Sequence, residues 1–464
     1  MTNVDDQKAS PTSEAEPMSD RRRKWGALTI LVGISISVLD ASMTNVALPP
    51  IARDLNQSAA AVVWIVNAYG LTVAMTLLPL SAIGERIGFK RMFRVGLIVF
   101  TTASVASALA PSLTVLLCCR VLQGLGAAAI MCLFGALIRH IYTPNSIARG
   151  IGLNAMTVGV MSVLGPTLGS FILSIANWHW IFAINLPIGL LALFGVRSLP
   201  DVARVRAPLD WVAALLSMIT VGLFIVGADY LATYPLPSLC LVAAGCASCV
   251  VLVRRSSGQT APLVPVDLFR IPAMRFALAA SASTFAAQMA TFVSLPFYLQ
   301  QTLHRPQASV GILLAGWPLG AALIALVAGR MSNRYPVALL CGVGAGAMAS
   351  GLLIIVLLPT DVSDACLIAA MTLAGIGFGF FQTPNNRVLI GSAPRHRAGA
   401  LGGIQATTRV FGQTFGAAVV ASAFSLSAGW GPMMGLWVAI TFATLAVTVN
   451  VVRYRQSFGA TTQG

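Results

Sequence analysis

The chain has 464 residues, of which 57% are hydrophobic and only 9% are charged, and its mean hydropathy is +0.83. A soluble domain carries about 25% charged residues, so this composition excludes an ordinary soluble protein and indicates a polytopic membrane protein. The net charge of +15 would suggest nucleic-acid binding in a soluble chain, whereas here the placement of the charges has to decide.

Residues 1–24 are polar and end in four basic residues, and the apolar run after them is too long for the hydrophobic part of a signal peptide. The first span is therefore expected to stay uncleaved and to act as a signal anchor. Apolar runs of spanning length, about 20 residues, then recur with short polar breaks. Fourteen spans are predicted: 25–49, 59–83, 92–110, 113–138, 150–174, 178–197, 209–231, 237–253, 272–299, 307–330, 336–358, 365–386, 400–426 and 431–452.

The positive charges test this count. With the amino terminus in the cytoplasm, the predicted inner side holds 25 of the 29 Lys and Arg residues. The outer loops hold Arg53 and Arg305, and the spans hold Arg120 and Arg409. Basic residues gather on the cytoplasmic side of membrane proteins. One missed span would assign every later loop to the wrong side and would remove this asymmetry. The pattern therefore predicts both termini in the cytoplasm and explains the basic balance without nucleic acid.

A weak internal repeat relates the first six spans to the last six. Segment 81–88 resembles 329–336, and segment 123–126 resembles 374–377. Parallel halves around a central substrate site are a transporter architecture. The predicted organisation is a polar tail 1–24, a six-span bundle 25–198, two extra spans with linkers 199–271, a second six-span bundle 272–453 and a tail 454–464.

The cysteines and glycine-rich segments give no sign of an enzyme. Eight cysteines lie in or beside apolar runs without a disulfide framework, and Cys246 and Cys249 lack the second ligand pair of a zinc site. The segment Gly124-Leu-Gly126 lies inside a span and follows no strand, so it is not a dinucleotide motif. The sequence shows no phosphate loop, metal cluster or hydrolase triad. We expect neither catalysis nor a cofactor.

Asp40 is the only carboxylate that the sequence places deep inside an apolar run. A charge at that depth costs roughly 2.5 kcal/mol or more, which makes Asp40 a functional candidate; the alternative is a helix break beside water. Asp40 lies roughly 13 Å and Arg120 roughly 12 Å from the outer ends of their spans, by the helical rise. The two are therefore level and can pair, and protonation of Asp40 would weaken the pair. Alternatively, Arg120 bonds backbone carbonyls and never meets Asp40.

Several motifs point to one family: LDASMTNVALP at 39–49, SAIGERIGFKRMF at 81–93, CRVLQGLGAAAIM at 119–131, GVMSVLGPTLGSFI at 159–172, and the segment 381–409. Together with fourteen spans they resemble the drug/proton antiporter branch of the major facilitator superfamily, the multidrug and quaternary-ammonium efflux type. The resemblance covers about residues 25–455. It implies an all-α polytopic membrane protein with two six-helix bundles plus two inserted spans, 14 transmembrane helices in all.

The resemblance also implies two motifs around the seam between the halves. The cytoplasmic gate motif comprises Glu85, Arg86, Gly88, Lys90 and Arg91. Its basic side chains can pair across the seam and its glycine permits a tight turn, while Glu85 stands where the family prefers Asp. The antiporter motif comprises Gly159, Gly165, Pro166 and Gly169. These small residues permit close helix approach and a bend; a packing groove without a directional role is the alternative.

Polar, aromatic and Met side chains of the spans are the candidates for a substrate cavity. They are Asn45, Tyr69, Gln123, Gln288, Met289, Trp317, Phe381, Gln382, Gln405 and Arg409. Gln405 and Gln413 flank Arg409 by one turn on each side, so the three share a helix face. Aromatic and Met surfaces can hold apolar or cationic drugs.

The predicted function is export of small amphipathic or drug-like compounds in exchange for protons across the cell inner membrane, with antibiotic resistance as its consequence. The expected partners are the substrate, protons and the lipid bilayer, with no nucleic acid, and the chain is expected to work as a monomer. Two alternatives stay open. One is a metabolite or siderophore exporter of the same fold, and the other is a non-transporting membrane sensor or partner subunit.

Overall fold

The structure, a computed structural model, describes residues 19–142, 147–202, 209–257, 259, 271–391, 398–427 and 429–461. Within these ranges the regular elements are all helical. They are α1 (Asp20–Asp54), α2 (Ala59–Ile87), α3 (Phe89–Ala108), α4 (Leu113–Met131), α5 (Phe134–Ile141), α6 (Ile147–Ile175), α7 (His179–Ala183), α8 (Asn185–Gly195), α9 (Trp211–Asp229), α10 (Pro235–Ser257), α11 (Pro272–Phe297), α12 (Gln307–Met331), α13 (Val337–Leu357), α14 (Asp364–Gly391), α15 (Ala398–Leu426) and α16 (Gly431–Thr461).

The helices follow from the apolar runs, because a chain crossing hydrocarbon must satisfy its backbone polar groups internally. Every one of the fourteen predicted spans falls on helix. Over the described residues, twelve helical stretches are long and apolar enough to cross a membrane, and α3 and α15 are not among them. Two predicted spans are interrupted: the fourth breaks at Cys132 and Leu133 between α4 and α5, and the sixth consists of α7 and α8.

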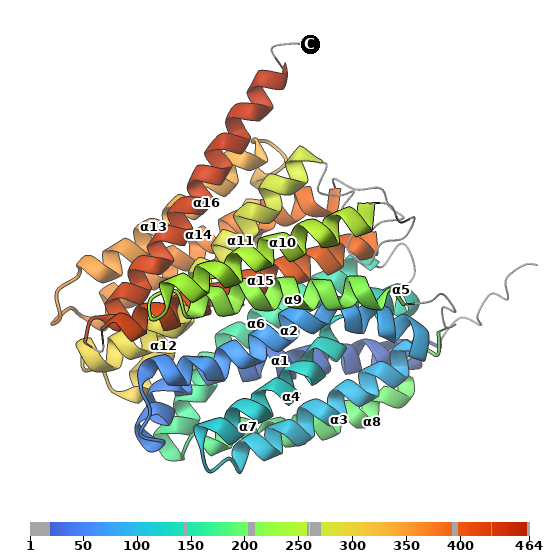
Figure 1. The fold of residues 1–464 in the computed structure, drawn as a ribbon, viewed down its shortest axis with the longest axis horizontal. Coiled ribbons are helices and arrows are strands. Elements are labelled where there is room, and N and C mark those ends of the chain that lie inside the picture. Colours follow the sequence, from blue (N-terminus) through green and yellow to red (C-terminus); the bar gives the residue numbers. More distant parts are fainter. Residues whose placement is uncertain are drawn as a thin grey trace, which may run out of the picture.

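The helices before α9 and those after α10 gather into two bundles (Figure 1). In the first, α1 packs on α6 and α8, and α4 packs on α2 and α3. In the second, α11 packs on α15 and α16, and α14 packs on α12 and α13. Helices α9 and α10 pack on each other, and α9 also lies against α2 and α15. The inserted pair therefore covers one seam between the bundles, where α2 meets α15.

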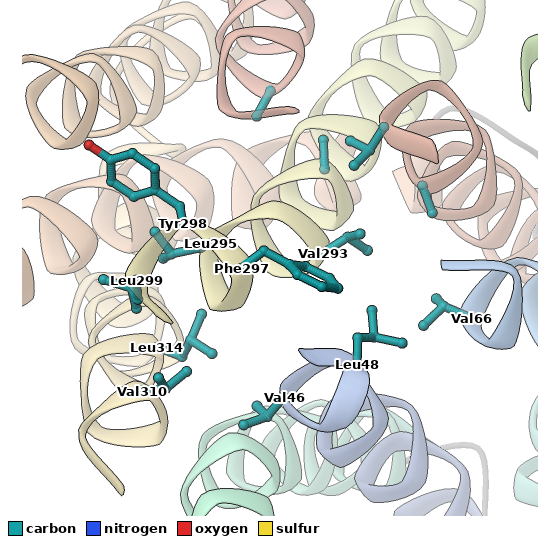
Figure 2. Close-up of a cluster of buried hydrophobic side chains, with 14 of the residues drawn as sticks. Val46, Leu48, Val66, Val293, Leu295, Phe297, Tyr298, Leu299, Val310 and Leu314 are labelled. Carbon is teal, nitrogen blue, oxygen red and sulfur yellow. The ribbon is translucent and has the colours of Figure 1, made fainter. Parts of the chain in front are cut away.

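The bundles are joined by an apolar cluster near one face. We call the face where α1 begins the terminal face, and the face where it ends the opposite face. Figure 2 shows Leu48 of α1 close to Phe297 of α11, within a buried cluster that draws on both bundles. Arg53 donates to Gln300 at 2.9 Å and Gln307 donates to the Val46 carbonyl at 3.4 Å, and both bonds cross between the bundles. The bundles are thus closed against each other at the opposite face.

Candidate functional site

Asp40 lies near the middle of α1 and its side chain is fully buried. Three side chains donate to its carboxylate. Arg120 Nη1 lies 2.6 Å from Oδ2, and Gln123 Nε2 and Asn185 Nδ2 lie 2.8 and 2.7 Å from Oδ1. The carboxylate is therefore held by one cation and two amides, from α4 and α8.

Arg120 of α4 is as deeply buried as its partner. Its Nε donates to the Ile65 carbonyl at 3.1 Å, and its Nη1 also donates to Gln123 Oε1 at 2.7 Å. The guanidinium lies over the Tyr69 ring, 4.3 Å from the centroid, where a cation–π contact adds attraction. Gly124 allows this approach, since a Cβ there would lie 2.8 Å from the Tyr69 carbonyl oxygen. Arg120 therefore meets Asp40 and also bonds a backbone carbonyl, so the alternative in which it never meets Asp40 does not hold.

The sequence reasoning missed Asn185 and Ser104. The Ser104 hydroxyl of α3 accepts from Gln123 at 2.7 Å and from Asn185 at 3.3 Å, so four helices contribute to the cluster. A polar amide inside an apolar run was the available signal for Asn185, which lies in the sequence FAINLPIG. Nothing in the local sequence distinguishes Ser104 from other small span residues.

A buried ion pair gains little net stability, because desolvation offsets the Coulomb attraction, but loss of one partner leaves an uncompensated buried charge. Here neutral amides satisfy the remaining lone pairs of Asp40. A proton on Asp40 would remove the charge that orients all three donors. The arrangement can therefore exist in two charge states with different hydrogen bonding, which is what a protonation switch requires.

Arg409 of α15 faces the same region from the second bundle. It lies within electrostatic range of the Tyr69 phenol, and its buried Nε has no hydrogen-bond partner among the described residues. Gln405 donates to Asn386 at 2.7 Å and Gln413 donates to Gln288 at 3.3 Å. This face of α15 therefore carries a polar row at the seam.

Of the other cavity candidates, Asn45, Trp317 and Met289 lie where the two bundles meet, and Phe381 does not. Asn45 lines a small pocket between α1, α6, α11 and α12, and its Oδ1 is buried without a partner in the described structure. Trp317 is buried against Phe292, and Met289 is partly buried at the edge of the apolar cluster that joins the bundles. Phe381 was expected in the cavity and is not there.

Phe381 instead packs with Ala280 and Cys341 inside the second bundle, because that face of α14 is turned toward α11 and α13. Gln382, the next residue, is only partly buried.

The gate motif lies at the junction of α2 and α3, where Gly88 has φ 97°. Glu85 is exposed, and Arg86 donates to the Ala82 carbonyl. Lys90 pairs with Asp201 at 3.0 Å, after the last helix of its own bundle, and not across the seam as expected. The reason is proximity: the chain leaving the first bundle passes the start of α3, close to Lys90.

The antiporter motif lies where α6 meets two neighbours. A Cβ on Gly165 would overlap the Cβ of Ser42 in α1, and one on Gly311 of α12 would lie 2.5 Å from the Pro166 carbonyl oxygen. Gly169 faces Met43, whereas no atom of the described residues lies within 4 Å of a Cβ built on Gly159. Three of the four residues therefore lie where α6 touches α1 or the other bundle.

A second buried carboxylate corrects the expectation that Asp40 is alone. Asp229 ends α9, is 6% exposed and accepts a hydrogen bond of 3.1 Å from Asn67 of α2. It lies near the end of the predicted span 209–231, and packing of α9 on α2 buries it.

Comparison with known proteins places these features in a wider group. The model of the Major Facilitator Superfamily matches residues 30–417 and, a second time, 277–458. A crystal structure of a bacterial homologue of the human lysosomal transporter Spinster, inward-facing and unoccupied, has a TM-score of 0.69 and 16% identity, over 94% of this chain and 98% of that one. At this identity the likeness concerns the fold.

Three relatives are similar over most of the sequence. The Uncharacterized transporter YebQ of Escherichia coli (strain K12) is 41% identical, covering 96% of this chain and 99% of that protein. The riboflavin transporter RibZ of Clostridioides difficile (strain 630) is 27% identical, over 88% of this chain and 89% of that protein. The multidrug efflux pump LfrA of Mycolicibacterium smegmatis is 29% identical, over 89% of this chain and 83% of that protein.

Proposed function

Because this chain belongs to the Major Facilitator Superfamily, we propose that it exports small amphipathic compounds in exchange for protons by alternating access. The observation that carries the proposal is the buried pair of Asp40 and Arg120, sealed by Gln123 and Asn185. An ionisable pair inside a membrane span is a functional site by default, since hydrocarbon penalises it. The fourteen-span drug/proton antiporter branch is the proposed place of the chain within the superfamily.

In the proposed cycle, Asp40 carries the proton and Arg120 senses it. Protonation removes the carboxylate charge, so the guanidinium keeps the Ile65 carbonyl, Gln123 and the rings of Tyr69 and Phe182 as partners. The released Arg120 would change how Tyr69 meets Arg409 across the seam of α2 and α15. Proton binding would thus be felt by both bundles.

The terminal face is proposed to be cytoplasmic in the inner membrane, with the gate motif at that side. The opposite face is closed by the apolar cluster and the bond between Arg53 and Gln300. The substrate would enter between the bundles from the cytoplasm and meet Asn45, Gln288, Met289, Trp317 and the polar row around Arg409.

The driving force sets a bound on the gradient. One proton moving through 100 mV contributes about 2.3 kcal/mol, and each pH unit adds about 1.4 kcal/mol. One proton per neutral compound would sustain roughly a fiftyfold gradient at such a potential. A monovalent cation exchanged one for one would gain from the pH difference alone.

A metabolite exporter is the second candidate, and the similarity to a protein named as a riboflavin transporter favours it. Similarity to a protein named as a multidrug efflux pump favours the first. Substrate choice depends on the shape of the cavity. A drug exporter and a metabolite exporter of this fold would share the outline of that cavity. Both keep the same role for Asp40.

The test uses inverted membrane vesicles with an imposed proton gradient, with ethidium and riboflavin as probes and a pH-sensitive dye as readout. We expect a probe to dissipate the gradient with the native chain and not with Asp40→Asn. The control is Asp361→Asn, which removes an exposed carboxylate of an outer loop. Normal pumping by Asp40→Asn would refute the coupling role. Riboflavin activity alone would favour the metabolite exporter, and no pumping by a folded native chain would favour a non-transporting role.

A further inference from the structure

The carboxylate of Asp229 is buried among neutral groups. Its Oδ1 accepts from Asn67 Nδ2 at 3.1 Å, and the Trp64 side chain also interacts with it. Tyr230, the next residue, has its ring 6.1 Å from that of Trp64. All these partners come from α2 or from the end of α9 itself.

No charged residue of the described chain interacts with Asp229. The titratable side chains that follow it in the chain are the phenols of Tyr230 and Tyr234, whose ring centroids lie 6.3 Å apart. The described groups of α10 and α15 near this end of α9 carry no charge. The Ser238 carbonyl of α10 lies beside Gly227, and the Ser422 and Ser425 hydroxyls of α15 bond Ala232 and Thr233, which follow Asp229 in the chain. An ionised carboxylate buried without a cation is costly, so burial here favours the neutral acid.

Asn67 can accommodate a neutral acid as well as a carboxylate. Its Nδ2 donates to Asp229, while its Oδ1 is buried without a hydrogen-bond partner among the described residues. Rotation of the amide by half a turn would present that oxygen to a carboxylic O–H. The site therefore has an acceptor ready for a bound proton.

Asp229 also lies where the inserted pair holds both bundles. It bonds to α2 of the first bundle, while just beyond it Ala232 N–H donates to Ser422 at 2.8 Å and Thr233 donates to Ser425 at 3.1 Å, both in α15 of the second. These contacts lie toward the opposite face, since α2 begins and α15 ends there. Separation of α2 from α15 at that face would break one set of bonds and admit water to Asp229.

We propose that Asp229 is a second proton-binding site, loaded from the outer side as the opposite face closes. In the open state water stabilises the carboxylate, and closure buries it together with a proton taken from outside. The proton returns to the same side when the face reopens, so it adds nothing to the transport stoichiometry. External acid would thereby favour the outer-closed state. The inference rests on the alternating access proposed above, but not on the role of Asp40.

The test measures the opening of the opposite face directly. Spin labels are placed at Gln57→Cys and Asp361→Cys, exposed positions on the two bundles at that face, after alanine replaces the eight native cysteines. All chains carry Asp40→Asn, so that titration of Asp40 cannot contribute. Between pH 8 and pH 5 we expect the ratio of short to long label distances to rise at least tenfold with Asp229, and less than twofold with Asp229→Asn.

Asp54→Asn is the matched control, because Asp54 lies on the same face and accepts from Trp178 at 2.7 Å. It should keep the full pH response. An equal response with Asp229→Asn, or none with Asp229 present, would overturn the proposal, whatever vesicle transport shows for Asp40. A second measurement needs no change at Asp229: the fluorescence difference between the chain and its Trp64→Phe variant should titrate between pH 5 and pH 8. A flat difference would equally contradict the proposal.

Discussion

The Asn185 side-chain amide donates a hydrogen bond of 2.7 Å to Asp40 Oδ1, so α8 holds the same carboxylate that α4 binds through Arg120. A hydrogen bond to a charged group contributes about 1.5–3 kcal/mol. This bond is stronger to the carboxylate than to a neutral acid, because a charged oxygen is the better acceptor. Asn185 is therefore a positioning residue for the proposed proton site, acting through Asp40.

Asn185→Leu should move the midpoint of the pH profile of transport upward by about one unit, since 1.4 kcal/mol corresponds to one unit. The measurement is probe-driven proton movement in vesicles between pH 6 and pH 9. Asn450→Leu serves as the control, because Asn450 is also a buried span amide but bonds only the Ala446 carbonyl in the described structure. A profile that loses height without moving would assign Asn185 a packing role only.

Arg120→Gln should destabilise the fold by about 3–5 kcal/mol, because it leaves Asp40 buried without a cation. The stability of the Arg120→Lys variant should lie between those of the native chain and Arg120→Gln. Lys keeps the charge but loses the Nε bond to Ile65 and the planar contact with Tyr69. Combining Arg120→Gln with Asp40→Asn should recover part of the loss, since no charge remains buried. Chemical unfolding in detergent measures all three, with the exposed Arg254→Gln as the control. Additive losses in the double variant would contradict a coupled pair.

Gly165→Ala should impair folding or transport severely, because its Cβ would overlap Ser42 and push α6 away from α1. Overpacking of this kind typically costs about 1–3 kcal/mol. Gly159→Ala belongs to the same motif but meets no atom within 4 Å among the residues that the structure describes, and should be nearly neutral. Expression, monodispersity in detergent and vesicle transport compare the two. Equal damage would mean that the motif needs flexibility rather than close packing.

Asp210 should contribute stability at neutral pH that is lost in acid. Hydrogen bonds from Arg255, and then from the Ala213 backbone N–H and Gln259, hold the pKa of Asp210 well below its ordinary value. Such a carboxylate stabilises the fold above its unfolded-state pKa, near 4, and the contribution disappears as pH falls through the lowered folded-state pKa.

Asp210→Ala also removes the cap of α9, and should cost about 1 kcal/mol at pH 7 and progressively less toward pH 3. Thermal unfolding at both pH values is the measurement. Asp201→Ala, which removes an exposed partner of Lys90, should change little at either pH. If Asp210→Ala lowers the stability as much at pH 3 as at pH 7, the negative charge of Asp210 does not contribute to stability.

The sequence alone predicted the helices and the two halves. Each span is a local consequence of an apolar run, since every backbone bond in a membrane helix closes within its own segment. The common depth of Asp40 and Arg120 likewise needed only the helical rise, and the two side chains do meet at 2.6 Å.

Partners across helices were decided by the tertiary structure. Which side of a span faces its neighbour depends on rotation about the helix axis, and a span that is apolar all round carries little signal for that rotation. Packing alone turned Asn185 toward Asp40, buried Asp229 against Asn67 and directed Phe381 into its own bundle. The depth of a residue in the membrane follows from its position along the sequence. The direction in which its side chain points around the helix axis is determined only when the helices pack together.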